Sequence, residues 1–72
     1  MISPKAKVSP TAQIYPEAVV SEGCTLGPNV HIYGEARIGR HVRMEPNVVV
    51  YGPAEIDEST YIGPNSIVGY PS

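Results

Sequence analysis

The chain has 72 residues, a formal net charge of −2 and a hydrophobic fraction of 42%. That length allows one domain over residues 1–72. The negative charge argues against nucleic acid as a partner, because proteins bind its phosphates through basic residues. We expect no membrane partner either, because no apolar run approaches the roughly 18–20 residues that span a bilayer. One cysteine excludes an internal disulfide.

The aliphatic residues favour strands over helices. The chain contains nine Val, seven Ile, one Leu and no Phe. β-branched side chains pack well on a sheet and lose conformational freedom in a helix. A compact core of this size is marginal by itself, so we expect a repeat lattice, an oligomer or both.

A six-residue period runs from Ile2 through the whole chain. The first place of every hexad is aliphatic or Met: Ile2, Val8, Ile14, Val20, Leu26, Ile32, Ile38, Met44, Val50, Ile56, Ile62 and Val68. The fifth place is always small: Ala6, Ala12, Ala18, Cys24, Val30, Ala36, Val42, Val48, Ala54, Thr60, Ser66 and Ser72. A hexapeptide period predicts a parallel β-helix, in which each hexad forms one short strand and one corner.

A second period of eighteen residues predicts a three-sided coil. Tyr15, Tyr33 and Tyr51 are eighteen apart, and so are the Pro-Asn pairs at 28–29, 46–47 and 64–65. Three hexads per coil place each residue above its own kind, which gives four coils of a triangular prism. Pro-Asn suits a type II corner, whose second residue has positive φ. Pro53 and Pro71 occupy that second corner place, so their corners must be built differently.

The hexads LGPNVH, IGRHVR and IGPNSI resemble those of the hexapeptide-repeat transferases. The opening ISPKAKVSPTAQI looks like the N-terminal coils of sugar-nucleotide acyltransferases, such as UDP-N-acetylglucosamine acyltransferase. The resemblance implies an all-β fold, a left-handed parallel β-helix, and a homotrimer. It also implies acyl transfer from acyl-CoA or acyl carrier protein to a sugar or sugar-nucleotide, with no tightly bound cofactor. The chain lacks the family's long loops and C-terminal helical domain, so we expect a small relative or a fragment.

Alternation along each strand points the second and sixth places outward and divides the surface into three walls. The first wall comprises Lys7, Ser9, Thr25, Gly27, Arg43, Glu45, Tyr61 and Gly63. The second comprises Ser3, Val19, Ser21, Arg37, Gly39, Glu55 and Asp57. Both are largely polar, and we expect them to be solvated. The third comprises Gln13, Tyr15, His31, Tyr33, Val49, Tyr51, Ile67 and Gly69.

The third wall is the candidate interface between copies of the chain. It carries no formal charge, and we assign the interface to Tyr15, Tyr33, Tyr51, Val49 and Ile67. An uncharged, tyrosine-rich strip has the composition of an interface. The alternative is that the tyrosines only stabilise the sheet by stacking along it.

His31, on the third wall, is the candidate catalytic residue. A neutral imidazole can take the proton of an attacking hydroxyl or amine, and the family's base is likewise a histidine near a cleft between subunits. The alternative is a histidine that hydrogen-bonds a neighbour. His41 lies beside Arg40 and Arg43, a basic cluster that is either solvated or meets a donor phosphate.

Metal catalysis is not expected, because two histidines do not supply a zinc site of the three-histidine kind. Cys24 occupies a place in its hexad that points inward, so we expect it to be an inert core residue. The rival function is a non-catalytic, self-associating β-helical module, or a designed or truncated solenoid. The missing disulfide and signal peptide favour the cytoplasm.

Overall fold

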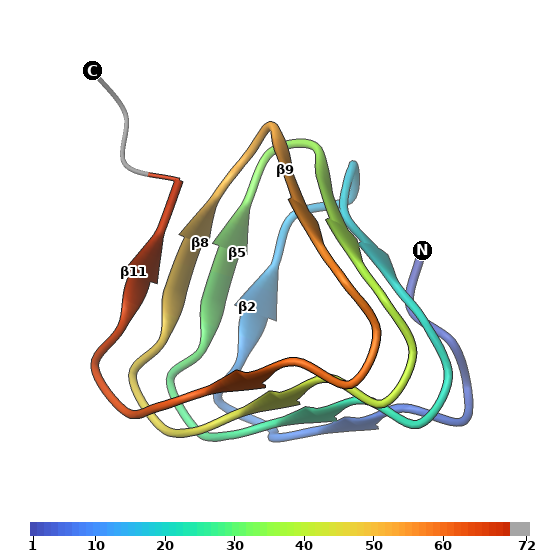
Figure 1. Ribbon diagram of the computed structural model, residues 1–72, viewed down its shortest axis with the longest axis horizontal. Helices are drawn as coiled ribbons and strands as arrows, with labels where there is room; N and C mark the ends of the chain where they lie inside the picture. The colour runs from blue at the N-terminus through green and yellow to red at the C-terminus, as the bar shows by residue number, and fades with distance from the viewer. Residues whose placement is uncertain (70–72) are drawn as a thin grey trace.

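The computed structural model describes residues 1–69, so Ser72 and the corner at Pro71 lie outside the described residues. It is an all-β solenoid with three parallel sheets that form the sides of a triangle (Figure 1). In Figure 1 the chain runs clockwise while it advances from the blue N-terminal coil at the back to the red coil in front, which is a left-handed path. The predicted left-handed parallel β-helix is confirmed.

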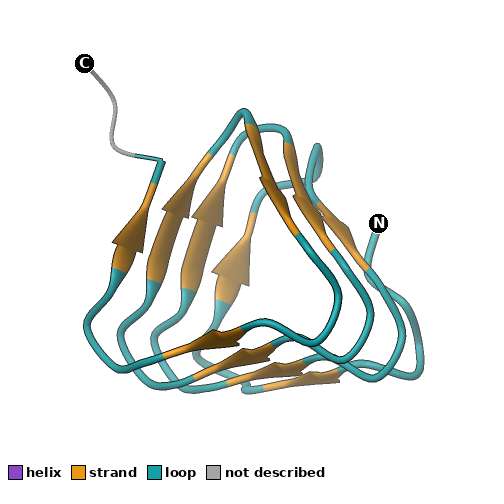
Figure 2. Cartoon of the chain, in the orientation of Figure 1, coloured by secondary structure: helices purple, strands orange, loops and turns teal. Residues whose placement is uncertain are grey.

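Eleven short strands alternate with corners, and the described residues contain no helix (Figure 2). The first wall is β1 (Lys7–Val8), β4 (Thr25–Leu26), β7 (Arg43–Met44) and β10 (Tyr61–Ile62). The second wall is β3 (Val19–Val20), β6 (Ala36–Ile38) and β9 (Ala54–Ile56), extended by a bridge from Ile2 to Val20. The third wall is β2 (Gln13–Ile14), β5 (His31–Tyr33), β8 (Val49–Tyr51) and β11 (Ile67–Val68).

The register of the sheets follows the eighteen-residue period. Thr25 pairs with Arg43, Val20 with Ile38, and Ile32 with Val50. A residue therefore lies beside the residue eighteen positions further on, as the four-coil prediction requires. No helix in residues 1–69 has the length and apolar character needed to cross a membrane.

The interior of the prism is filled by the first and fifth places of the hexads. Every buried hydrophobic residue comes from these places: Ala18, Val20, Cys24, Leu26, Val30, Ile32, Ala36, Ile38, Val42, Met44, Val48, Val50, Ile56 and Ile62. The alternation of aliphatic and small side chains lets the three sides of the prism meet around one axis. The end coils cover their own core less well, and Ile2 is 43% exposed.

Corners of several kinds connect the strands. Asn29, Asn47 and Asn65 have φ near 60°, as the Pro-Asn pairs predict. Their backbone N–H groups turn along the prism axis, so that Asn47 donates to the Pro28 carbonyl at 3.0 Å and Asn65 to the Pro46 carbonyl at 3.1 Å. Asparagine tolerates this conformation better than most residues.

The N-terminal coil and the Pro53 corner use other turns. At Pro4, Pro10 and Pro16 the turn closes on itself, because the alanine that follows donates to the carbonyl three residues earlier at 3.0 Å. At Pro53 the Gly52–Pro53 peptide bond is cis. The expectation that this corner differs from the Pro-Asn corners is therefore confirmed.

Candidate functional site

The sheet β2-β5-β8-β11 carries the side chains that the sequence assigns to the third wall. His31 lies between Gln13 and Val49 in the ladder, and Tyr33 lies beside Tyr51. Because β5 presents its first and third residues outward, His31 and Tyr33 share one face while Ile32 is buried. The fold thus brings together the predicted base and the predicted interface residues.

The tyrosines form a continuous column along this wall. The ring centroids of Tyr15 and Tyr33 lie 5.0 Å apart in an edge-to-face arrangement, and those of Tyr33 and Tyr51 lie 5.3 Å apart and stacked. Both are favourable aromatic geometries. The tyrosines therefore do contact one another along the sheet, as the alternative to an interface role requires. Tyr15 and Ile67 nevertheless remain 46% and 55% exposed. Tyr15 directly follows β2, the strand at one end of this sheet, and Ile67 lies on β11 at the other, so the wall keeps apolar surface exposed at both of its ends.

His31 is tied to this column through a hydrogen bond. Its Nδ1 lies 3.0 Å from the Tyr33 hydroxyl, and the two rings meet edge to face. The bond fixes one ring nitrogen, and His31 is only half-buried. When Nδ1 carries the proton and donates it to the tyrosine, the lone pair resides on Nε2. The arrangement can therefore accept a proton from a group that approaches the wall.

His41 has a structural role at its corner. Its φ is 60°, and its imidazole packs directly on Gly23 of the preceding coil, where an added Cβ would lie 2.3 Å from Nδ1. Arg40 forms an ion pair with Glu58 at 3.4 Å. The basic cluster expected around His41 therefore includes a carboxylate partner.

The first wall carries a small polar cluster that spans two coils. Arg43 donates from Nε to the Glu45 carboxylate at 3.3 Å, and the Tyr61 hydroxyl donates to the same oxygen at 3.1 Å. The hydrogen bond to Glu45 raises the pKa of the Tyr61 phenol above its usual value, because the neutral phenol is the donor. Arg43 thus lies beside a carboxylate as Arg40 does.

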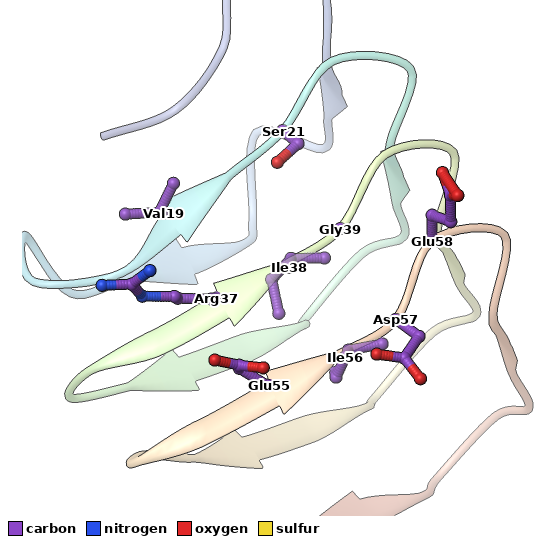
Figure 3. A pocket seen from close by; sticks show the side chains of 9 residues that line it. All are labelled: Val19, Ser21, Arg37, Ile38, Gly39, Glu55, Ile56, Asp57 and Glu58. Atoms are coloured by element: carbon purple, nitrogen blue, oxygen red, sulfur yellow. The ribbon is translucent and has the colours of Figure 1, made fainter.

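A shallow hollow of about 420 Å³ lies on the second wall (Figure 3). Small residues, Ser21 and Gly39, leave the space between taller side chains, and Arg37 and Glu55 stand on one side of it. The sequence places these residues on one wall but gives no sign of the hollow, because the depth depends on differences in side-chain height between neighbouring columns.

No metal centre is present among residues 1–69, where no three histidine, cysteine or carboxylate side chains gather closely enough to hold an ion. Cys24 is 1% exposed, and its thiol donates to the Gly39 carbonyl at 2.9 Å. Its predicted place in the core is confirmed.

One family model matches the chain over residues 17–52, which is half of its length, and it describes the bacterial transferase hexapeptide with six repeats. The chain belongs to this hexapeptide-repeat transferase family. No curated protein and no solved structure matches it. The matched repeats form the middle of the solenoid, from β3 to β8.

His31 and the column from Tyr33 to Tyr51 lie within the matched hexapeptide repeats, whereas Tyr15 and Ile67 lie outside them. The family match covers the two central strands of the third wall, β5 and β8, but does not assign roles to individual side chains. The role of His31 and the interface on the third wall therefore stay predictions.

Proposed function

We propose that the domain transfers an acyl group from acyl-CoA or acyl carrier protein to a hydroxyl or amine of a sugar or sugar-nucleotide. The observation that carries the proposal is the hexapeptide transferase match, which spans the coil containing His31. The likeness of the opening coils to sugar-nucleotide acyltransferases supports the choice of acceptor. We also propose a cytoplasmic location for this reaction.

His31 acts as the general base in this proposal. In the tautomer whose Nδ1 donates to the Tyr33 hydroxyl, 3.0 Å away, Nε2 carries the lone pair and accepts the proton of the acceptor group. The acceptor oxygen or nitrogen then forms a bond to the thioester carbonyl carbon. The bond from that carbon to sulfur breaks, and the imidazolium returns the proton to the departing thiolate. No tightly bound cofactor is needed.

A homotrimer supplies the second side of the proposed cleft. A single flat wall binds two substrates poorly, because it surrounds neither. The third wall carries the exposed apolar side chains of Tyr15 and Ile67 and no formal charge. Packing this wall against a neighbouring copy would bury them and enclose His31.

The test is release of free thiol from acetyl-CoA and longer acyl-CoA donors in the presence of a UDP-sugar acceptor. We expect His31→Gln to lower the rate by about 10²–10⁴-fold, the usual contribution of a general base. His41→Asn is the matched control, because asparagine tolerates positive φ and the proposal gives His41 no chemical role. It should keep the full rate.

Two results would contradict the proposal. Full activity of the His31→Gln variant would show that His31 is not the general base. If the protein forms an oligomer of constant mass but releases no thiol from any donor, the result would instead favour a non-catalytic, self-associating module.

A further inference from the structure

The third wall has differently charged neighbours on its two sides. In Figure 1 it meets the first wall at one corner of the prism and the second wall at another. β5 begins at His31, beside the uncharged corner 28–29, and ends at Tyr33, beside the corner that carries Glu35. His31 therefore lies on the first-wall side of the third wall, and the tyrosine column lies on the second-wall side.

Carboxylates predominate on the second-wall side. The corner between the two walls carries Glu17 and Glu35, and the second wall carries Glu55 and Asp57. Arg37 is the cation of this wall, and it lines one hollow with Glu35 and Glu55 and another with Glu17 and Glu35. The carboxylates outnumber it, so an anionic ligand that approaches from this side meets net repulsion.

The first-wall side carries cations instead. In the ladder Thr25 lies between Lys7 and Arg43, and its strand β4 directly precedes β5 in the chain. Arg43 forms an ion pair with Glu45 at 3.3 Å. Lys7 is exposed, and within residues 1–69 it forms no ion pair. Lys7 is therefore the cation of this wall that an anionic ligand would meet without a competing carboxylate.

The surface between Lys7 and His31 is free of acidic residues. Residues 7–14 and 25–32 form the first wall, the third wall and the corner between them in the first two coils, and their sequence contains neither Asp nor Glu. At this corner the hydroxyls of Ser9 and Thr11 lie 3.3 Å apart. Hydroxyl groups can donate hydrogen bonds to phosphate oxygens, so the surface suits a phosphate chemically as well as electrostatically.

We infer that the phosphates of the acyl donor bind on the first-wall side of His31, with Lys7 as their cationic contact. This inference rests on the proposed acyl transfer. Both proposed donors carry the acyl group on a pantetheine arm that ends in phosphate, so the anionic end and the thioester are far apart. With the phosphates at Lys7, the arm crosses the corner 28–29 and brings the thioester to His31. The acceptor is left the side of the tyrosine column.

The experiment is equilibrium binding of CoA to the full chain, measured by isothermal titration calorimetry at low ionic strength. Lys7→Gln should weaken binding by about fivefold, the effect of one unit charge about 4 Å from a phosphate charge in water. Lys7→Arg keeps the charge and should bind as the unmodified chain does. Added salt should reduce the difference between Lys7→Gln and the unmodified chain, because both charges are exposed to solvent.

Arg37→Gln is the matched control. Arg37 also holds the sixth place of its hexad, is exposed, and forms no ion pair within the described residues. The variant removes the same charge from the molecule but on the second wall, so its affinity for CoA should be unchanged. In the thiol-release assay Lys7→Gln should raise KM for acetyl-CoA and leave kcat unchanged, since Lys7 lies away from the reacting atoms.

The outcomes separate this inference from the proposed function. If the chain binds CoA and both variants lose affinity equally, or Arg37→Gln loses more, the donor phosphates do not lie at Lys7, and acyl transfer stands without this inference. A chain that neither binds CoA nor releases thiol would overturn the proposed function and the inference together. Urea unfolding of each variant checks that the fold is retained.

Discussion

Alanine at Gly39 should destabilise the solenoid because the next coil lies too close to admit a side chain. Gly39 is the second residue of its hexad, on the floor of the second-wall hollow (Figure 3). A Cβ there would lie 2.7 Å from the Glu58 nitrogen, 2.8 Å from the Ile56 oxygen and 3.0 Å from the Asp57 carbonyl carbon. All three atoms belong to the backbone, so rotation of a side chain cannot relieve the contacts.

The size of the effect follows from these distances. Ordinary van der Waals contact needs about 3.5 Å, so the next coil would have to move by about 0.8 Å relative to Gly39. That movement also stretches the hydrogen bond from the Gly39 N–H to the Ile56 carbonyl, which is 2.8 Å long. Overpacking of this kind costs about 1–3 kcal/mol of unfolding free energy.

Gly63 is a matched control, since it occupies the same place in its hexad. A Cβ at Gly63 would meet nothing within 4 Å. Gly63→Ala should stabilise the fold by about 0.4–1 kcal/mol, because alanine restricts the unfolded chain. Gly27→Ala, whose nearest backbone atoms lie at 3.1 Å, should fall between the two.

Urea unfolding followed by far-UV circular dichroism measures the difference. With a slope of about 1 kcal/mol/M for a chain of this size, Gly39→Ala and Gly63→Ala should have midpoints separated by at least about 1 M. Equal midpoints for the two variants would refute the reasoning, because the coil spacing would then be soft enough to accept a Cβ at either place.

Three further predictions follow from other parts of the fold. Asn47→Ala should lower the unfolding free energy by about 1–2 kcal/mol in the same urea assay, because φ is 65° there, whereas Asn47→Gly should cost less; equal losses would show that the backbone conformation is not the cause. Ile32→Ala should cost about 2–5 kcal/mol, since Ile32 is fully buried in the middle of the stack; a cost like that of alanine at exposed Ile67 would contradict the assigned core. The Tyr61 phenol should ionise at higher pH than an ordinary tyrosine in a titration of absorbance near 295 nm, and Glu45→Gln should lower that value. Because the folded pKa is raised, the stability that this hydrogen bond contributes is complete below about pH 10 and is lost as the pH rises through the folded pKa.

The sequence was sufficient for the architecture because inward and outward places alternate without a break. The first and fifth places of the hexads identify the core residues of the inner coils, and the period of Tyr15, Tyr33 and Tyr51 identifies the coil. The contact between His31 and Tyr33 also follows, because two residues of one strand separated by one position share a face.

The features that were not predicted depend on side-chain lengths and backbone angles, which the six-residue period of the sequence does not encode. The hollow beside Arg37 arises because Gly39 and Ser21 are short while their neighbours are long. The packing of the His41 ring on Gly23 depends on a side-chain direction set at a corner with positive φ. Neither the cis bond before Pro53 nor the self-closed turn at Pro10 can be read from the position of proline in the hexad.

The hydrogen bonds between coils have a mechanical consequence. The donors of the strands and of the Pro-Asn corners point along the prism axis, toward the residue one coil away. A force that pulls the two end coils apart along this axis meets only the bonds of one coil at a time, so the solenoid should unwind in steps of about one coil. A force across a wall loads several rows in shear together. We therefore expect the protein to yield at lower force when it is pulled along the prism axis than when it is pulled across a wall.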